Sequence, residues 1–361
     1  MIERIKWLDD LKGFAIFLIV LGHVAVTVEN ISTGSVQSIS NALFKGIYSF
    51  HVPLFFMIAG LTFSARSSFL EFFVKKFKRL MIPYYVWGGI SAILVIVLSH
   101  FVLPLINSAA TTTHFAEKSD VGAWWIPLVS ILHAGAWPNG KGFFFNGVLW
   151  FLPVLFCTEL FYYWVARYLK KTGDLFLSLG ALLMVLLIAS PLINKCVPFN
   201  LPCLIRYLPF VAIGHILGGV LLQHQRIEMS IKFSCGMLLL VIFGCSYFFD
   251  IARASSPFWV AWLTRATVLS IIVVELARHG VFRYFSMLAP YTIAIMLFHK
   301  YPLVVLQIAT AKYLQIVLNN GIGSVLLCIA ITAISIVLSI AAGKVIIRFM
   351  PWSLGTSRQK A

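Results

Sequence analysis

Long runs of apolar residues, separated by short polar connectors, constrain the fold of this chain more than any other feature. Hydrophobic residues make up 60% of the sequence and charged residues 11%, whereas soluble domains average about 45–50% and about 25%. A run of about 20 apolar residues crosses the hydrocarbon layer as one helix. We therefore predict an all-α, polytopic integral membrane protein.

We predict about ten transmembrane helices in one membrane domain over residues 1–351, followed by a short cytoplasmic tail over residues 352–361. The predicted spans are 8–28, 43–63, 80–103, 146–166, 174–193, 204–222, 232–249, 257–277, 286–308 and 322–348. Arg206 and Arg265 lie within the sixth and eighth spans, which makes these two the weakest of the set.

Basic residues gather in every second connector, and this alternation predicts the orientation. The connectors carry Arg4 and Lys6; Arg66, Lys75, Lys76, Lys78 and Arg79; Arg167, Lys170 and Lys171; Arg226 and Lys232; Arg278 and Arg283; and Arg348, Arg358 and Lys360. Connectors rich in Lys and Arg stay in the cytoplasm, so both termini are predicted to be cytoplasmic in a multi-pass protein of the inner (plasma) membrane. The basic connectors account for the net charge of +16. Nucleic-acid binding is not indicated, because no basic stripe in the sequence alternates with aromatic residues.

Ionisable side chains inside predicted spans are costly and often mark function. They are Lys12, His23, His51, Glu159, Arg206, His215, Arg265, Glu275 and His299. Lys12 and His23 are eleven residues apart, which is about 16 Å and close to three turns of one helix face. A ligand with a phosphate head and a long arm, such as acyl-CoA, fits that separation. The spacing alone is better explained by separate structural roles, in which Lys12 at a helix end reaches toward water and His23 bonds a neighbouring helix.

The remaining candidates also carry two interpretations each. His51 lies close to Pro53, where it is either a ligand or base, or a partner for a backbone carbonyl that proline frees. Lys76 and Arg79 precede the third span as topogenic charges or as phosphate contacts. Glu159 is either a buried acid that pairs with a His or Arg, or a site residue, and His299 is open to the same two interpretations.

Five segments, taken in chain order, resemble the motifs of acyltransferase family 3, the group that includes fucose 4-O-acetylase-like proteins. They are RIKWLDDLKGFAIFLIVLGH, FHVPLFFMIAG, KFKRLMIPYY, LWFLPVLF and APYTIAIMLFH. The first resembles the family signature of an Arg or Lys, ten residues and a His, here Lys12 and His23 with Asp9 before them. The second, third and fifth place His51, Lys76 with Arg79, and Tyr291 with His299, and the fourth resembles a stretch of the family's middle span.

This resemblance implies an O-acyltransferase that moves an acyl group, typically acetyl, from cytoplasmic acyl-CoA to a sugar hydroxyl of a cell-surface polysaccharide or its lipid-linked precursor. It implies His23 as general base, with Asp9, His51, Glu159 and His299 as further catalytic residues. It implies donor binding by Lys12, Lys76, Arg79 and Tyr291. We expect acetyl-CoA as donor substrate, no permanently bound cofactor, no metal, and the lipid bilayer and the glycan as partners.

The chain departs from the family pattern at a few positions. Ala59 replaces the usual Ser, Lys76 stands where Arg is common, and Pro302 follows His299 later than in many relatives. The short segment after the last predicted span predicts no additional soluble esterase-like domain. The alternative function is a transporter of a lipid-linked sugar or small solute, although the repeat-related broken helices typical of transporters are not visible in the sequence.

Overall fold

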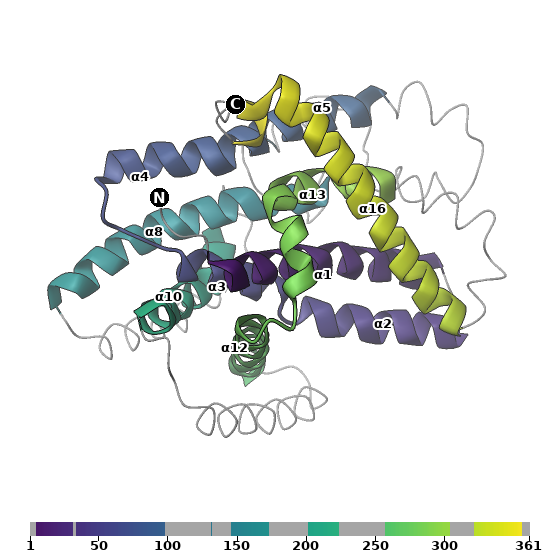
Figure 1. Ribbon diagram of the computed structural model, residues 1–361, viewed down its shortest axis with the longest axis horizontal. Coiled ribbons are helices and arrows are strands. Elements are labelled where there is room, and N and C mark those ends of the chain that lie inside the picture. Colours follow the sequence, from purple (N-terminus) through teal and green to yellow (C-terminus); the bar gives the residue numbers. More distant parts are fainter. Residues whose placement is uncertain are drawn as a thin grey trace. The chain divides into compact units, whose positions relative to one another are not determined.

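A computed structural model of the chain describes residues 5–31, 34–97, 131, 146–172, 201–223, 257–303 and 321–355. Every regular element in these residues is helical, which confirms the all-α prediction (Figure 1). The predicted spans 174–193 and 232–249 lie outside the described residues. The count of ten spans and the cytoplasmic placement of both termini therefore stay predictions.

Four described helical stretches are long and apolar enough to cross a membrane, namely Lys6–Glu29, Ile39–Leu61, Gly147–Tyr168 and Val325–Phe349. A fifth crossing is possible by a bent pair, Trp262–Arg278 with Arg283–Phe298, whose axes differ by 107°. The chain divides into two compact units, one of Met1–Phe63 with Phe210–Ile340, the other of Ser64–Pro209 with Ala341–Ala361.

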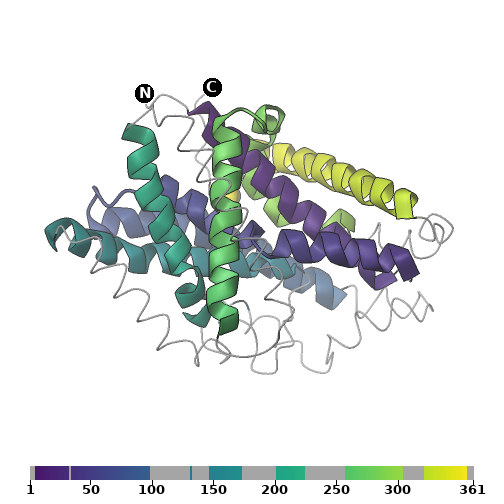
Figure 2. The same ribbon diagram turned by 90° about the horizontal axis from the view of Figure 1, so that it is seen from below.

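The first unit begins with an antiparallel pair of helices, α1 (Lys6–Ile31) and α2 (Gly34–Tyr48). Figures 1 and 2 show α2 returning along α1. The side-chain amide of Asn41 donates to Glu29 near the turn, and Gly22 faces Tyr48 at the other end. Because this pairing joins the middle of α1 to the end of α2, it brings the neighbourhood of His23 next to the segment that precedes His51.

The predicted span 43–63 falls largely within the stretch Ile39–Leu61, which contains a two-residue turn: α2 ends at Tyr48, and α3 (His51–Leu61) follows after Ser49 and Phe50. A proline inside a helix commonly kinks it. Instead, Pro53 occupies the first turn of α3, where a missing N–H removes no helical hydrogen bond. The interruption lies before the proline, where the backbone N–H of Phe50 donates to the carbonyl of Ile47 at 3.2 Å.

Glycines let α3 and α10 (Leu201–Gln223) approach within backbone contact in the first unit. A Cβ on Gly214 would lie 2.1 Å from the carbonyl oxygen of Met57, and one on Gly60 would lie 2.2 Å from that of Val211. Gly218, four residues after Gly214, meets α3 in the same way. Small residues four apart are the usual device for close helix packing in membranes, where apolar burial adds no driving force.

The first unit also contains α12 (Pro257–Arg278), the 3-10 helix η8 (Arg283–Tyr291), α13 (Thr292–Phe298) and most of α16 (Gly321–Phe349). α12 ends in a Schellman motif, since Gly280 has φ +75° and its N–H donates to Ala277, while Val281 N–H donates to Leu276. The chain then turns sharply into η8, which packs along α1. There the carbonyl of Phe285 lies so close to Gly13 that a Cβ would overlap it.

The second unit contains α4 (Phe69–Lys76), the π-helical turn η1 (Phe77–Met81), α5 (Ile82–Val97), the 3-10 turn η4 (Gly147–Trp150), α8 (Phe151–Thr172) and the 3-10 turn η9 (Pro351–Leu354). Ser68 and Glu71 form a capping box that starts α4. α8 packs against α4 and η1, and η9 packs against α5.

Candidate functional site

His23 lies on α1 and is bonded to a tyrosine that the sequence analysis did not single out. The hydroxyl of Tyr48, at the end of α2, lies 2.8 Å from His23 Nδ1, and the two rings meet edge to face. Gly22 makes the approach possible, because a Cβ there would lie 3.1 Å from the Tyr48 ring. The phenol hydroxyl can either donate to Nδ1 or accept from it.

Two further histidines lie beside this pair, and both are bonded to backbone. His51 Nδ1 donates to the carbonyl of Ile47 at 2.9 Å, and His299 Nδ1 donates to that of Ile295 at 2.8 Å. Since a carbonyl only accepts, each ring carries its proton on Nδ1 and leaves Nε2 as an acceptor when neutral. The Ile47 carbonyl that His51 contacts is not the one that Pro53 frees, which belongs to Ser49, four residues before the proline.

We call His23, Tyr48, His51 and His299 the histidine cluster. The centroid of the Tyr48 ring lies 4.6 Å from that of His51, and the centroid of the His23 ring lies 5.3 Å from that of His299. His51 is 3% exposed and His299 is fully buried. Within the described part of the chain, Nε2 of His299 has no hydrogen-bond partner. The structure thus brings together three histidines that the sequence analysis proposed separately.

Lys12 lies eleven residues before His23 on the same uninterrupted helix, about 16 Å along its axis. Its ammonium nitrogen is 4.0 Å from a carboxylate oxygen of Asp9, one turn earlier, and its side chain is 30% exposed. The neighbouring Asp10, which the sequence analysis passed over, is the buried acid at 2% exposure. Tyr291 is half-buried at the end of η8, next to the start of α13.

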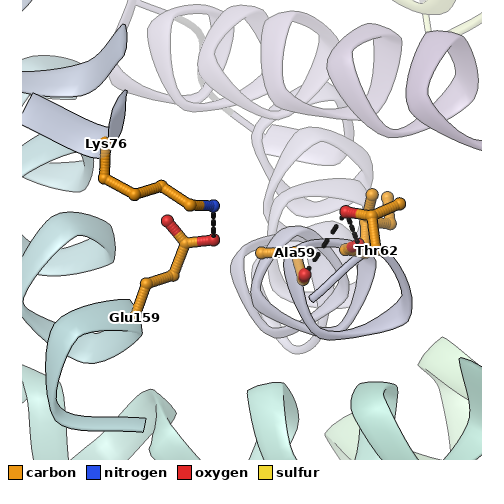
Figure 3. Close-up of polar contacts among 5 residues, drawn as sticks. Ala59, Thr62, Lys76 and Glu159 are labelled. Carbon is orange, nitrogen blue, oxygen red and sulfur yellow. Dashed lines mark hydrogen bonds and ion pairs between the residues drawn. The ribbon is translucent and has the colours of Figure 1, made fainter. Parts of the chain in front are cut away.

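In the second unit, Lys76 pairs with Glu159, whose side chain is 2% exposed (Figure 3). We expected Glu159 to pair with a His or Arg, so this lysine corrects the prediction. Lys76 ends α4 and lies over the ring of Phe72, while Glu159 lies on α8. A buried carboxylate needs such a cation because burial without a partner is strongly unfavourable.

Arg79 is exposed on η1, where the basic motif adopts a π-helical turn. The C-terminal turn η9 packs closely behind this backbone: a Cβ on Gly355 would lie 2.7 Å from Cα of Arg79. Trp87 of α5 also donates from Nε1 to the carbonyl of Ser353 at 3.1 Å. Single π turns inside α-helices are frequent at functional sites, and η1 places Arg79 on such a turn.

Ala59 lacks the hydroxyl of the serine that the resembled motif usually has at this position. A different hydroxyl, that of Thr62, lies at the C-terminal end of α3. Thr62 donates to the carbonyl oxygens of Ile58 at 3.3 Å and Ala59 at 3.4 Å (Figure 3). At Ala59 itself, the side chain is a methyl group without hydrogen-bonding capacity. The departure from the family pattern therefore removes a polar group from α3 without interrupting the helix.

The described apolar helices of membrane-spanning length are those of a membrane protein. A family model described as an acyltransferase domain matches residues 5–342, nearly the whole chain, so the protein belongs to acyltransferase family 3. It is a membrane acyltransferase. Comparison with curated proteins and with solved structures found no match.

Proposed function

We propose that this acyltransferase moves an acetyl group from acetyl-CoA to a hydroxyl of a sugar, in a cell-surface polysaccharide or its lipid-linked precursor. The proposed location is the inner (plasma) membrane. The observation that carries the proposal is the placement of His23, whose Nδ1 is bonded to Tyr48 while Lys12 lies three turns away on the same helix. Such a site offers a base and a cation at a separation suited to a long phosphorylated donor.

His23 acts as general base through Nε2 in the proposed reaction. Nε2 takes the proton of the sugar hydroxyl as its oxygen attacks the thioester carbonyl carbon. The new C–O bond forms, the C–S bond breaks, and the departing CoA thiolate takes the proton from the imidazolium. The products are the O-acetyl sugar and free CoA. An acetyl-His intermediate is the other route open to an imidazole.

Lys12 is the proposed contact of this helix to the donor phosphates, with Asp9 holding its ammonium toward the helix end. His51 and His299 are proposed acceptors for hydroxyl or amide protons of the substrates, because each presents Nε2 as an acceptor when neutral. Tyr291 is retained as a proposed donor contact on the basis of its motif.

In the second unit, Arg79 is the proposed phosphate contact, since its guanidinium is exposed and matches phosphate in a bidentate geometry. Lys76 is a weaker candidate than its motif implies, because Glu159 already neutralises its charge. We propose that this ion pair holds η1 in position for Arg79.

The test is transfer of isotope-labelled acetyl from acetyl-CoA to a glycan fraction, with purified protein in detergent and alkali-labile label as the readout. We expect His23→Ala to lower transfer by about 10²–10⁴-fold, the usual contribution of a general base. His279→Ala is the matched control, because His279 is an exposed histidine of the same unit outside the histidine cluster. Full activity in His23→Ala would exclude the proposed base, and absence of label with folded wild-type protein would favour another donor or transport.

A further inference from the structure

The partner of Nδ1 distinguishes His23 from the other imidazoles of the histidine cluster. His51 and His299 each donate from Nδ1 to the backbone carbonyl four residues earlier in the chain. His23 instead meets the hydroxyl of Tyr48, which comes from a different helix. The orientation of His23 therefore depends on a side chain that can be substituted, whereas the other two are held by backbone.

A general base at Nε2 needs its proton on Nδ1, and that proton needs an acceptor. When Nε2 takes a second proton from the substrate, the ring becomes an imidazolium. Its Nδ1–H bond to an oxygen then becomes charge-assisted and stronger. The Tyr48 oxygen is the acceptor placed for this, at 2.8 Å from Nδ1.

The ring of Tyr48 is fixed by its neighbours, so the hydroxyl has a defined position. The ring centroid lies 4.2 Å from that of Phe44 and 4.6 Å from that of His51, and the absence of a side chain at Gly22 admits its edge. A ring packed on two sides has few alternative rotamers, and a group placed in advance of the reaction is the arrangement that lowers a barrier most.

We propose that Tyr48 is the positioning residue of the reaction: it holds His23 through Nδ1 in the tautomer whose Nε2 is the base, and it stabilises the imidazolium that forms. This inference rests on the proposed function for its kinetic consequence. The hydrogen bond itself is a property of the protein without substrate, so it can be tested independently of acyl transfer.

Tyr48→Phe removes the hydroxyl and keeps the ring. We expect kcat for acetyl transfer to fall by about 10–100-fold, which corresponds to about 1.4–2.7 kcal/mol of transition-state stabilisation. KM for acetyl-CoA should change by less than about twofold, because the substitution removes an interaction used in the transition state and no donor contact. The matched control is Tyr163→Phe, which deletes a hydroxyl that donates to the Ser67 carbonyl at 2.8 Å in the second unit.

A spectroscopic measurement separates the inference from the proposed function. In protein labelled with ¹⁵N-histidine, the NMR signals of the two ring nitrogens of His23 are assigned by their disappearance in His23→Ala. The chemical shifts of these signals are then compared between wild type and Tyr48→Phe. We expect Tyr48→Phe to shift them and Tyr163→Phe to leave them in place. Unchanged His23 signals in Tyr48→Phe would overturn the inference, as would a shift accompanied by wild-type kcat where His23→Ala is inactive. An active His23→Ala would instead overturn the proposed function, and the nitrogen signals alone would then decide whether Tyr48 holds His23.

Discussion

Gly214→Ala tests the closest helix contact of the first unit. The added Cβ would lie 2.1 Å from the carbonyl oxygen of Met57, whereas ordinary van der Waals contact begins at 3.4 Å. The shortfall is about 1.3 Å, and the obstacle is backbone, so α3 and α10 must separate. Such overpacking costs about 3 kcal/mol, and the better helix propensity of alanine returns about 1 kcal/mol.

The expected net loss is about 2 kcal/mol, which lowers the midpoint of thermal unfolding by about 4–8 °C. The assay is heating in detergent followed by size-exclusion chromatography of the protein that remains folded. Gly219→Ala is the matched control on the same helix, because a Cβ there has nothing within 4 Å. Midpoints of Gly214→Ala and Gly219→Ala that agree within about 1 °C would refute the close contact.

Two predictions concern the second unit. Lys76→Met should lower the free energy of unfolding by about 3–5 kcal/mol, because it leaves the Glu159 carboxylate buried without its cation. Adding Glu159→Leu should recover most of the loss in thermal unfolding, and failure to recover would show that the ion pair is not the cause. Gly355→Ala should cost about 1–3 kcal/mol, because Gly355 has φ +66° and closely approaches Arg79. Faster hydrogen exchange of residues 351–355 is the readout, and wild-type exchange would contradict it.

The sequence was most informative about the helices themselves. The spans 204–222 and 257–277 contain Arg206 and Arg265, yet both regions form long helices, α10 and α12. The apolar run decides helix formation, and one long cationic side chain within it changes where the helix sits rather than whether it forms.

Interruptions were harder to predict, because they depend on local hydrogen bonds that hydropathy does not record. The break between α2 and α3 is made by the Ile47 carbonyl, which accepts from both Phe50 N–H and His51 Nδ1. The predicted span 286–308 likewise begins as the 3-10 helix η8, after the turn at Gly280. Gly280 was a visible signal, since glycine at the end of an apolar helix is typical of a Schellman motif.

The histidine cluster could be predicted only in part. His23, His51 and His299 stand out in the sequence as polar residues in apolar segments. Tyr48 does not, because a tyrosine is ordinary near a membrane surface. Its pairing with His23 depends on the register between α1 and α2, which only the folded pair defines. Asp10 was missed for a similar reason, since burial distinguishes it from Asp9 and composition does not.

The π turn η1 has a consequence for how the chain can change in length. In η1 the N–H of Ile82 bonds the carbonyl of Phe77, five residues back, so this turn holds one residue more than an α-helical turn. One residue corresponds to about 100° around a helix. α4 and α5 are therefore two helices out of phase, joined by a single-residue insertion. Removing one residue of η1 would change the rotation of α4 relative to α5 by about 100°, so that side chains on the two helices would face in new relative directions. The relative direction of the side chains before and after η1 thus depends on the length of the segment as well as on its composition.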